Sequence, residues 1–81
     1  MKLGIYTIDG ALFEGEIKKI TAGTATGEIT VLDGHIPLVS LLHGQKIKLV
    51  DKNDAEIIIP LKSGFLEVRP NNETVILAGD A

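Results

Sequence analysis

The chain has 81 residues, a net charge of −3 and no cysteine, so it makes one small domain without disulfides or a cysteine-bound metal. Its 44% hydrophobic residues are typical of a globular protein rather than a disordered one. Basic residues are scattered and aromatic residues are few, which argues against nucleic-acid binding. No apolar run approaches the roughly 20 residues of a membrane helix.

The N-terminal part of the chain predicts two strands. Residues 2–8 alternate between two faces, which is the period of a strand, and Asp9-Gly10 follows as a turn signal. A second, bent strand is expected at 13–20, where Gly15 indicates a bulge or a close backbone approach. Small residues and two glycines at 21–27 indicate a loop.

The middle of the chain predicts two strands joined by a short, stiff connection. Residues 28–32 form the third expected strand, which ends at Asp33-Gly34. Pro37 then biases Ile36 toward extended backbone. A short buried strand is expected at 38–42, followed by a turn at 43–45.

The second half predicts two hairpins and no substantial helix. The expected strands are residues 46–49, 56–59, 65–69 and 74–78. Polar turns at 51–54 and 70–72 join them in pairs. The window 45–59 lacks Gly and Pro, but its apolar residues form no helical stripe. We therefore predict an all-β fold over residues 1–81, a flattened sandwich or barrel of about ten short strands.

The sequence contains no convincing catalytic, metal or phosphate motif. No Gly-x-Ser-x-Gly elbow is present, and Glu14 and Glu16 fit a solvated strand face better than a glycosidase pair. His35 and His43 are eight apart and lack further ligand spacing. The glycine-bearing segment 23–28 lacks the lysine and helix of a phosphate loop. We expect no catalytic residue, no metal and no cofactor.

His35 is the residue with two open interpretations. It follows the tight turn Asp33-Gly34 and precedes the rigid Ile36-Pro37, so it is held on a surface corner. It can cap its own turn by hydrogen bonding. Alternatively, its imidazole, with a donor, an acceptor and a flat face, can contact a partner. The residues alone leave both interpretations open.

Three blocks of sequence, in this order and at this spacing, are similar to one family. They are Asp9-Gly10 with 12–17 (LFEGEI), then 27–32 (GEITVL) with Gly34-His35 and Pro37-Leu38, and 63–68 (SGFLEV) with 74–78 (TVILA). Together they resemble the N-terminal β-sandwich domain of the epsilon subunit of F-type ATP synthases. The resemblance covers nearly the whole chain.

The resemblance implies a mechanical role. Such a domain is a non-catalytic central-stalk subunit that couples the gamma subunit to the membrane c-ring during proton-driven ATP synthesis. It lies at the cytoplasmic face of the bacterial membrane without inserting into it. Glu28 falls where the family has a carboxylate facing the c-ring loops, and His35 at a turn histidine near the gamma and c-ring contacts. Gly64 and Phe65 are expected to be structural. The residues implied to shape that surface are Gly27, Gly34, Ile36, Pro37 and Leu38.

Departures from the family pattern limit what is carried over. Family members usually continue into a two-helix hairpin, and this chain stops at Asp80-Ala81, as either a natural short form or an excised domain would. Nucleotide binding, which depends on that hairpin, is not expected. Asp33 replaces a frequent proline. The alternatives are a small-ligand or carbohydrate-binding sandwich with Tyr6 and Phe13 as its platform, and a small hydrolase dependent on His35.

Overall fold

The computed structural model describes residues 1–44 and 46–79, which form eight strands and no helix. The strands are β1 (Lys2–Thr7), β2 (Gly10–Thr24), β3 (Gly27–Leu32), β4 (Leu38–His43), β5 (Lys46–Asp51), β6 (Glu56–Pro60), β7 (Ser63–Arg69) and β8 (Glu73–Ala78). The all-β prediction is confirmed, with eight strands in the described residues where about ten were expected. Gln45, part of an expected turn, and the terminal pair 80–81 lie outside the described residues.

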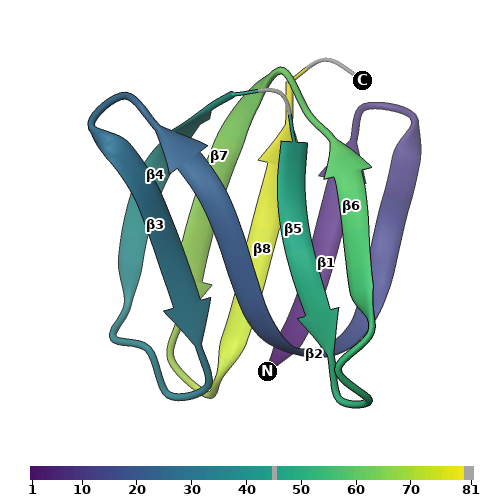
Figure 1. The fold of residues 1–81 in the computed structure, drawn as a ribbon. Helices are drawn as coiled ribbons and strands as arrows, with labels where there is room; N and C mark the ends of the chain where they lie inside the picture. The colour runs from purple at the N-terminus through teal and green to yellow at the C-terminus, as the bar shows by residue number, and fades with distance from the viewer. Residues whose placement is uncertain (45, 80–81) are drawn as a thin grey trace.

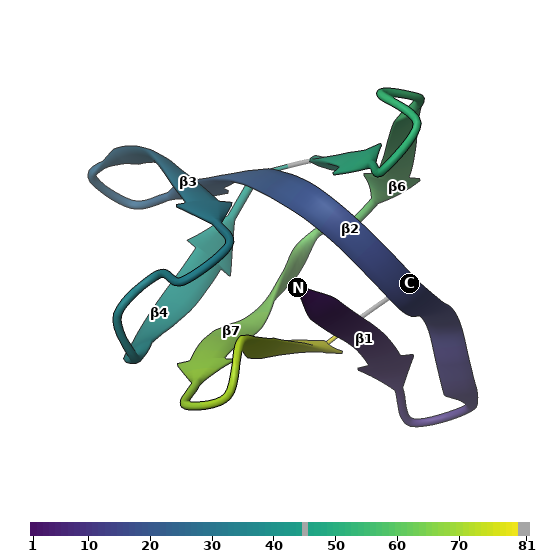
Figure 2. The same ribbon diagram turned by 90° about the horizontal axis from the view of Figure 1, so that it is seen from below.

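The strands form one curled sheet that folds into two layers (Figure 1). We call the layer ordered β4-β7-β8-β1 and the first half of β2 sheet A. Sheet B contains the second half of β2, with β3 on one side of it and β5 then β6 on the other. Figure 2 shows β2 running across the molecule from beside β1 to beside β3. All pairs are antiparallel except β1 with β8.

The second half of β2 corrects the loop that we expected at 21–27. Thr21 pairs with Thr30 on β3 and with Lys48 on β5, so the strand continues to Thr24. Hydrogen bonding on both sides outweighs the weak strand propensity of a glycine-containing segment. At Gly23 an added Cβ would lie 2.6 Å from the carbonyl oxygen of His43, which explains a glycine inside a strand.

The bulges of β2 lie elsewhere than expected. Ile5 pairs with Phe13 and Tyr6 with Ala11, which leaves Leu12 as the extra residue. A second irregularity falls at Lys18, where the pairing with β5 shifts. Gly15 sits in regular register, so the expectation of a bulge there is wrong.

The core lies between the two layers. It consists of the side chains that point inward from strands whose residues alternate between the two faces. Its largest fully buried side chains are Leu3, Ile5, Ile17, Ile20, Val31, Ile47, Leu49, Leu66, Thr74 and Ile76. Thr74 is the one buried polar residue among these, and its hydroxyl donates to the sulfur of Met1 at 3.4 Å. A core of Ile, Leu and Val fits the β-rich composition.

Candidate partner-binding surface

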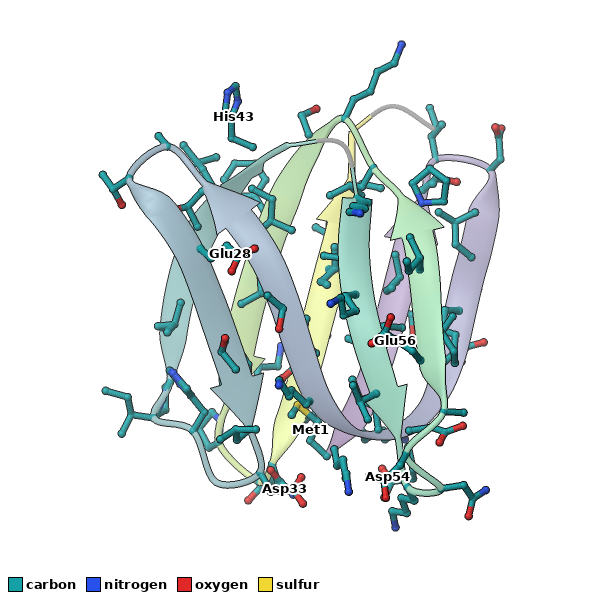
Figure 3. The ribbon with its side chains drawn as sticks, viewed as in Figure 1. Met1, Glu28, Asp33, His43, Asp54 and Glu56 are labelled. Atoms are coloured by element: carbon teal, nitrogen blue, oxygen red, sulfur yellow. The ribbon has the colours of Figure 1, made fainter. Side chains whose placement is uncertain are left out.

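The predicted contact residues lie at the two ends of β3 rather than in one place. Glu28 is the second residue of this strand, and Gly34 follows its far end. Asp33 lies five positions after Glu28, which is about 17 Å of extended chain at the usual rise of a strand. Figure 3 labels Glu28 toward one end of β3 and Asp33 beyond the other end. The sequence resemblance therefore points to two separate areas of the surface.

The loop after β3 is tied to the turn between β7 and β8. Gly34 has a φ of 78°, a region that glycine enters without steric cost. Its N–H donates to Oδ1 of Asn72 at 2.9 Å. The N–H of His35 donates to the carbonyl of Leu32 at 3.1 Å, which closes the turn. These bonds fix the path of the chain that leads to the predicted contact residues.

Asp33 joins the same turn to the N-terminus. Its carboxylate pairs with the ammonium group of Met1 and accepts a hydrogen bond from Nδ2 of Asn72 at 3.4 Å. The Met1 ammonium also donates to the carbonyl of Ile17 at 2.8 Å. The bond from the ammonium, followed by that from Asn72, holds the pKa of Asp33 below its ordinary value. This network was not foreseen from the sequence.

The side chain of His35 makes a hydrogen bond to the residue that follows it. Its Nδ1 lies 2.7 Å from the carbonyl oxygen of Ile36. A carbonyl can only accept, so Nδ1 carries the hydrogen in this contact. In the neutral ring Nε2 is then an acceptor. A contact with a partner through Nε2 is compatible with this arrangement, so the two interpretations do not exclude each other.

The next three residues have different environments. Ile36 is 73% exposed and Pro37 is also exposed, whereas Leu38 is half-buried and packs against the core. Leu38 is the first residue of β4 and pairs with Val68. Ile36 and Pro37 are therefore available to a partner, and Leu38 anchors the loop to the sheet.

Glu28 lies on the outer face of sheet B. Its side chain is exposed and has no hydrogen bond or ion pair with the described residues. It borders a shallow groove whose other polar lining residues are Lys19, Thr21, Thr30, Lys46 and Lys48. Of the lysines, Lys48 is 3.8 Å from the carboxylate of Glu56, labelled in Figure 3. Glu28 therefore offers an unpaired negative charge beside a basic groove.

The other candidate groups from the sequence, the histidine pair and Glu14, do not form a catalytic or metal site with the described residues. His35 and His43 lie at opposite ends of β4, and no group of three metal-ligating side chains occurs within residues 1–44 and 46–79. Glu14 accepts a hydrogen bond from the hydroxyl of Tyr6 at 3.2 Å, which raises the pKa of that phenol. No helix long and apolar enough to cross a membrane is found in the described part of the chain.

The aromatic platform of the ligand-binding alternative is incomplete. Phe13 is half-buried and packs against the core, with its ring beside Gly15. Tyr6 is half-buried, and its ring lies over Gly4 beside a groove that also contains charged residues of β2, β7 and β8. Phe65, expected to be structural, is 51% exposed on the outer face of sheet A. Its neighbour Gly64 is structural, because an added Cβ would lie 2.4 Å from the carbonyl oxygen of Leu77.

Comparison with known proteins decides the family. Residues 1–81 match the model described as "ATP synthase, Delta/Epsilon chain, beta-sandwich domain". The chain belongs to this family. It is 36% identical over 74 residues to the ATP synthase epsilon chain of an Exiguobacterium strain, covering 91% of this chain and 54% of that one. The epsilon chain of Anoxybacillus flavithermus is also 36% identical, over 94% of this chain and 56% of its own length. The chain thus spans about half the length of these relatives.

Solved structures confirm the fold. A chain in the Euglena gracilis mitochondrial ATP synthase (OSCP/F1/c-ring) superposes with a TM-score of 0.89 at 23% identity, covering 96% of this chain and 49% of that one. A chain in the Tetrahymena thermophila central stalk and c-ring gives 0.80 at 17% identity, over 99% and 63%. At such identities the structural similarity supports the β-sandwich architecture alone.

Proposed function

We propose that this chain is a non-catalytic rotor subunit of an F-type ATP synthase. It joins the gamma subunit to the c-ring in the central stalk and serves proton-driven ATP synthesis without a cofactor of its own. The observation that supports this most is the placement of an unpaired Glu28 and a braced, exposed loop at opposite ends of β3. A subunit that joins two partners needs two such separate contacts.

Glu28 serves the electrostatic contact of this proposal. It is exposed and unpaired within the described residues, so a basic group of a c-ring loop meets no internal competitor. Charges of this kind guide association and fix orientation more than they add affinity. The lysines across the groove favour a c-ring loop that carries both a basic and an acidic group.

The loop at residues 34–37 serves the second contact, to gamma. Its hydrogen bonds to Asn72 and Leu32 order it before any partner arrives. A preordered loop loses little conformational entropy on binding. Exposed Ile36 supplies apolar area, and Nε2 of His35 accepts a hydrogen bond from the partner. The complex lies at the cytoplasmic face of a bacterial membrane, where the domain binds peripherally.

The direct test is calorimetric titration of the chain into isolated gamma subunit, followed by assembly on purified c-rings. We expect saturable one-to-one binding to gamma. The double variant Glu28→Ala/His35→Ala should keep its melting temperature and weaken assembly of the rotor by about tenfold or more. The matched control is Glu56→Ala, an exposed carboxylate on the same sheet face at the opposite edge. No binding by the folded chain, or equal assembly by both variants, would contradict the proposal.

A further inference from the structure

The free edge of β4 differs from the other free edges in the described residues. A free strand edge invites pairing with another chain unless charge, proline or a bulge opposes it. The edge strand β6 carries Glu56 and Pro60, and β3 carries Glu28. The first half of β2, which pairs only with β1, has its bulge at Leu12 and two glutamates. β4 pairs with β7 alone, in unbroken register, and has no charged residue, proline or bulge between Leu38 and Leu42.

An apolar row crosses sheet A beside this edge. Leu41 lies directly opposite Phe65 on β7, and Phe65 directly opposite Leu77 on β8. These three side chains are 64%, 51% and 54% exposed on the outer face. Val39, two residues before Leu41 on the same face, is 68% exposed. Exposed apolar residues gathered in this way mark a surface that a partner covers.

Charged residues bound the row on the same face. The guanidinium of Arg69 lies 3.1 Å from Glu67 and 3.7 Å from Glu73, so both carboxylates are paired with the same cation. Arg69 and Glu73 lie at the end of β7 and β8 that is remote from Phe65 and Leu77. Glu67 follows Phe65 on the same face and lies directly opposite Val39, so it borders the row itself. An apolar centre with a paired, polar rim is the usual anatomy of a protein interface.

We propose that an extended segment of the gamma subunit adds to the free edge of β4 as a further strand of sheet A and extends this row beyond Leu41. The inference rests on the function proposed above, because it takes gamma as the partner. The added segment is uncharged and carries apolar side chains at alternate positions, since a strand there presents every second residue to the outer face. Main-chain hydrogen bonds with β4 give the contact its register.

Continuity with the braced loop favours gamma over a second copy of this chain. Ile36 is 73% exposed, Pro37 follows it, and β4 begins at the next residue. The loop contact proposed for gamma therefore runs without a gap into Val39 and Leu41. A partner that holds the loop reaches the β4 edge with the same segment of surface.

Calorimetric titration into isolated gamma, with one variant at each of two edges, tests the proposal. Leu41→Lys places a charge on the β4 edge, and Ile58→Lys places the same charge on β6, where the replaced residue is 50% exposed. We expect Leu41→Lys to weaken binding at least about tenfold and Ile58→Lys to change it less than about twofold. Matching melting temperatures show that both variants fold. Amide hydrogen exchange should then show new protection along β4, and none along β6, when gamma is bound.

The possible failures are distinguishable. If the unaltered chain does not bind gamma, both the proposed function and this inference are wrong. If it binds and both lysine variants bind equally well, or β4 gains no protection, only the strand-addition inference is overturned. If the chain alone sediments as a dimer that Leu41→Lys dissociates, the edge belongs to a second copy and the assignment to gamma is overturned.

Discussion

The two ends of β3 present their exposed groups by different means. At the Glu28 end the backbone is a regular ladder, and Glu28 itself projects without a partner in the described residues. At the Asp33 end the chain leaves the ladder, and the side chains of Asp33 and Asn72 hold it in place. The first end thus offers a charge on a rigid strand, and the second offers a shape that depends on polar side chains.

This difference has a consequence for mutation. At the Glu28 end, stability depends on close backbone packing and should not change when the exposed carboxylate is removed. At the Asp33 end, stability and loop geometry should respond to the side chains of Asp33 and Asn72. Four substitutions, in decreasing order of expected effect, can sharpen or break the distinction.

The largest effect is expected from Gly23→Ala. Gly23 pairs with Glu28, and a Cβ there would lie 2.6 Å from the backbone oxygen of His43, so strands must move apart. Overpacking of this kind costs about 1–3 kcal/mol in free energy of unfolding, measured by urea titration. The control is Gly15→Ala, whose Cβ would make an ordinary 3.4 Å contact with Phe13. Equal losses of unfolding free energy in both variants would contradict the idea that the close backbone approach at Gly23 requires glycine.

Asn72→Gly should have the next largest effect. It removes the acceptor for the Gly34 N–H and the donor to Asp33, while glycine tolerates the φ of 59° found at this position. We expect a loss of about 1 kcal/mol and faster amide exchange at Gly34. Asn71→Gly is the matched control, since Asn71 has a similar φ of 71°. Unchanged exchange at Gly34 would mean that the turn does not need Asn72.

Glu28→Gln tests the opposite expectation. Because the carboxylate is exposed and unpaired among the described residues, neutralising it should change the free energy of unfolding by less than about 0.5 kcal/mol. Chemical denaturation followed by circular dichroism suffices. A loss near 2 kcal/mol would place Glu28 among the structural residues and remove the contrast between the two ends.

The smallest effect concerns pH. Its hydrogen bonds lower the pKa of Asp33 in the folded chain, so their contribution is complete above the unfolded value of about 4 and is lost as pH falls through the lower folded value. The melting temperature of the native chain should therefore fall slightly more than that of Asp33→Asn between about pH 5 and pH 2. Parallel curves for the two proteins would show that the pairing contributes nothing to stability.

Local sequence patterns predicted most of the fold. The alternation at 28–32 and 46–49 and the turn signal at Asp9-Gly10 were confirmed, because each depends on neighbours within a few residues. The strand at 21–24 was missed since its stability comes from partners on β3 and β5. Local composition contains no record of such pairing.

The structure of the candidate surface was predicted less completely, for a related reason. The hydrogen bond of His35 joins it to the adjacent residue Ile36, and the sequence left open whether the imidazole bonds locally or contacts a partner. The link from Gly34 to Asn72 spans 38 positions, and nothing in either segment indicates the other. The exposure of Phe65 was likewise missed, because alternation shows that adjacent residues face opposite sides but not which side is covered.

The uninterrupted course of β2 through both layers has a mechanical consequence. In a sandwich whose layers meet only through side chains, a sideways load lets one layer slide over the other. Here the backbone of β2 belongs to sheet A up to Glu16 and to sheet B from Ile17 onward. The covalent backbone of β2 therefore transmits a sideways load from one layer to the other. The two layers should resist sliding and move as one rigid unit.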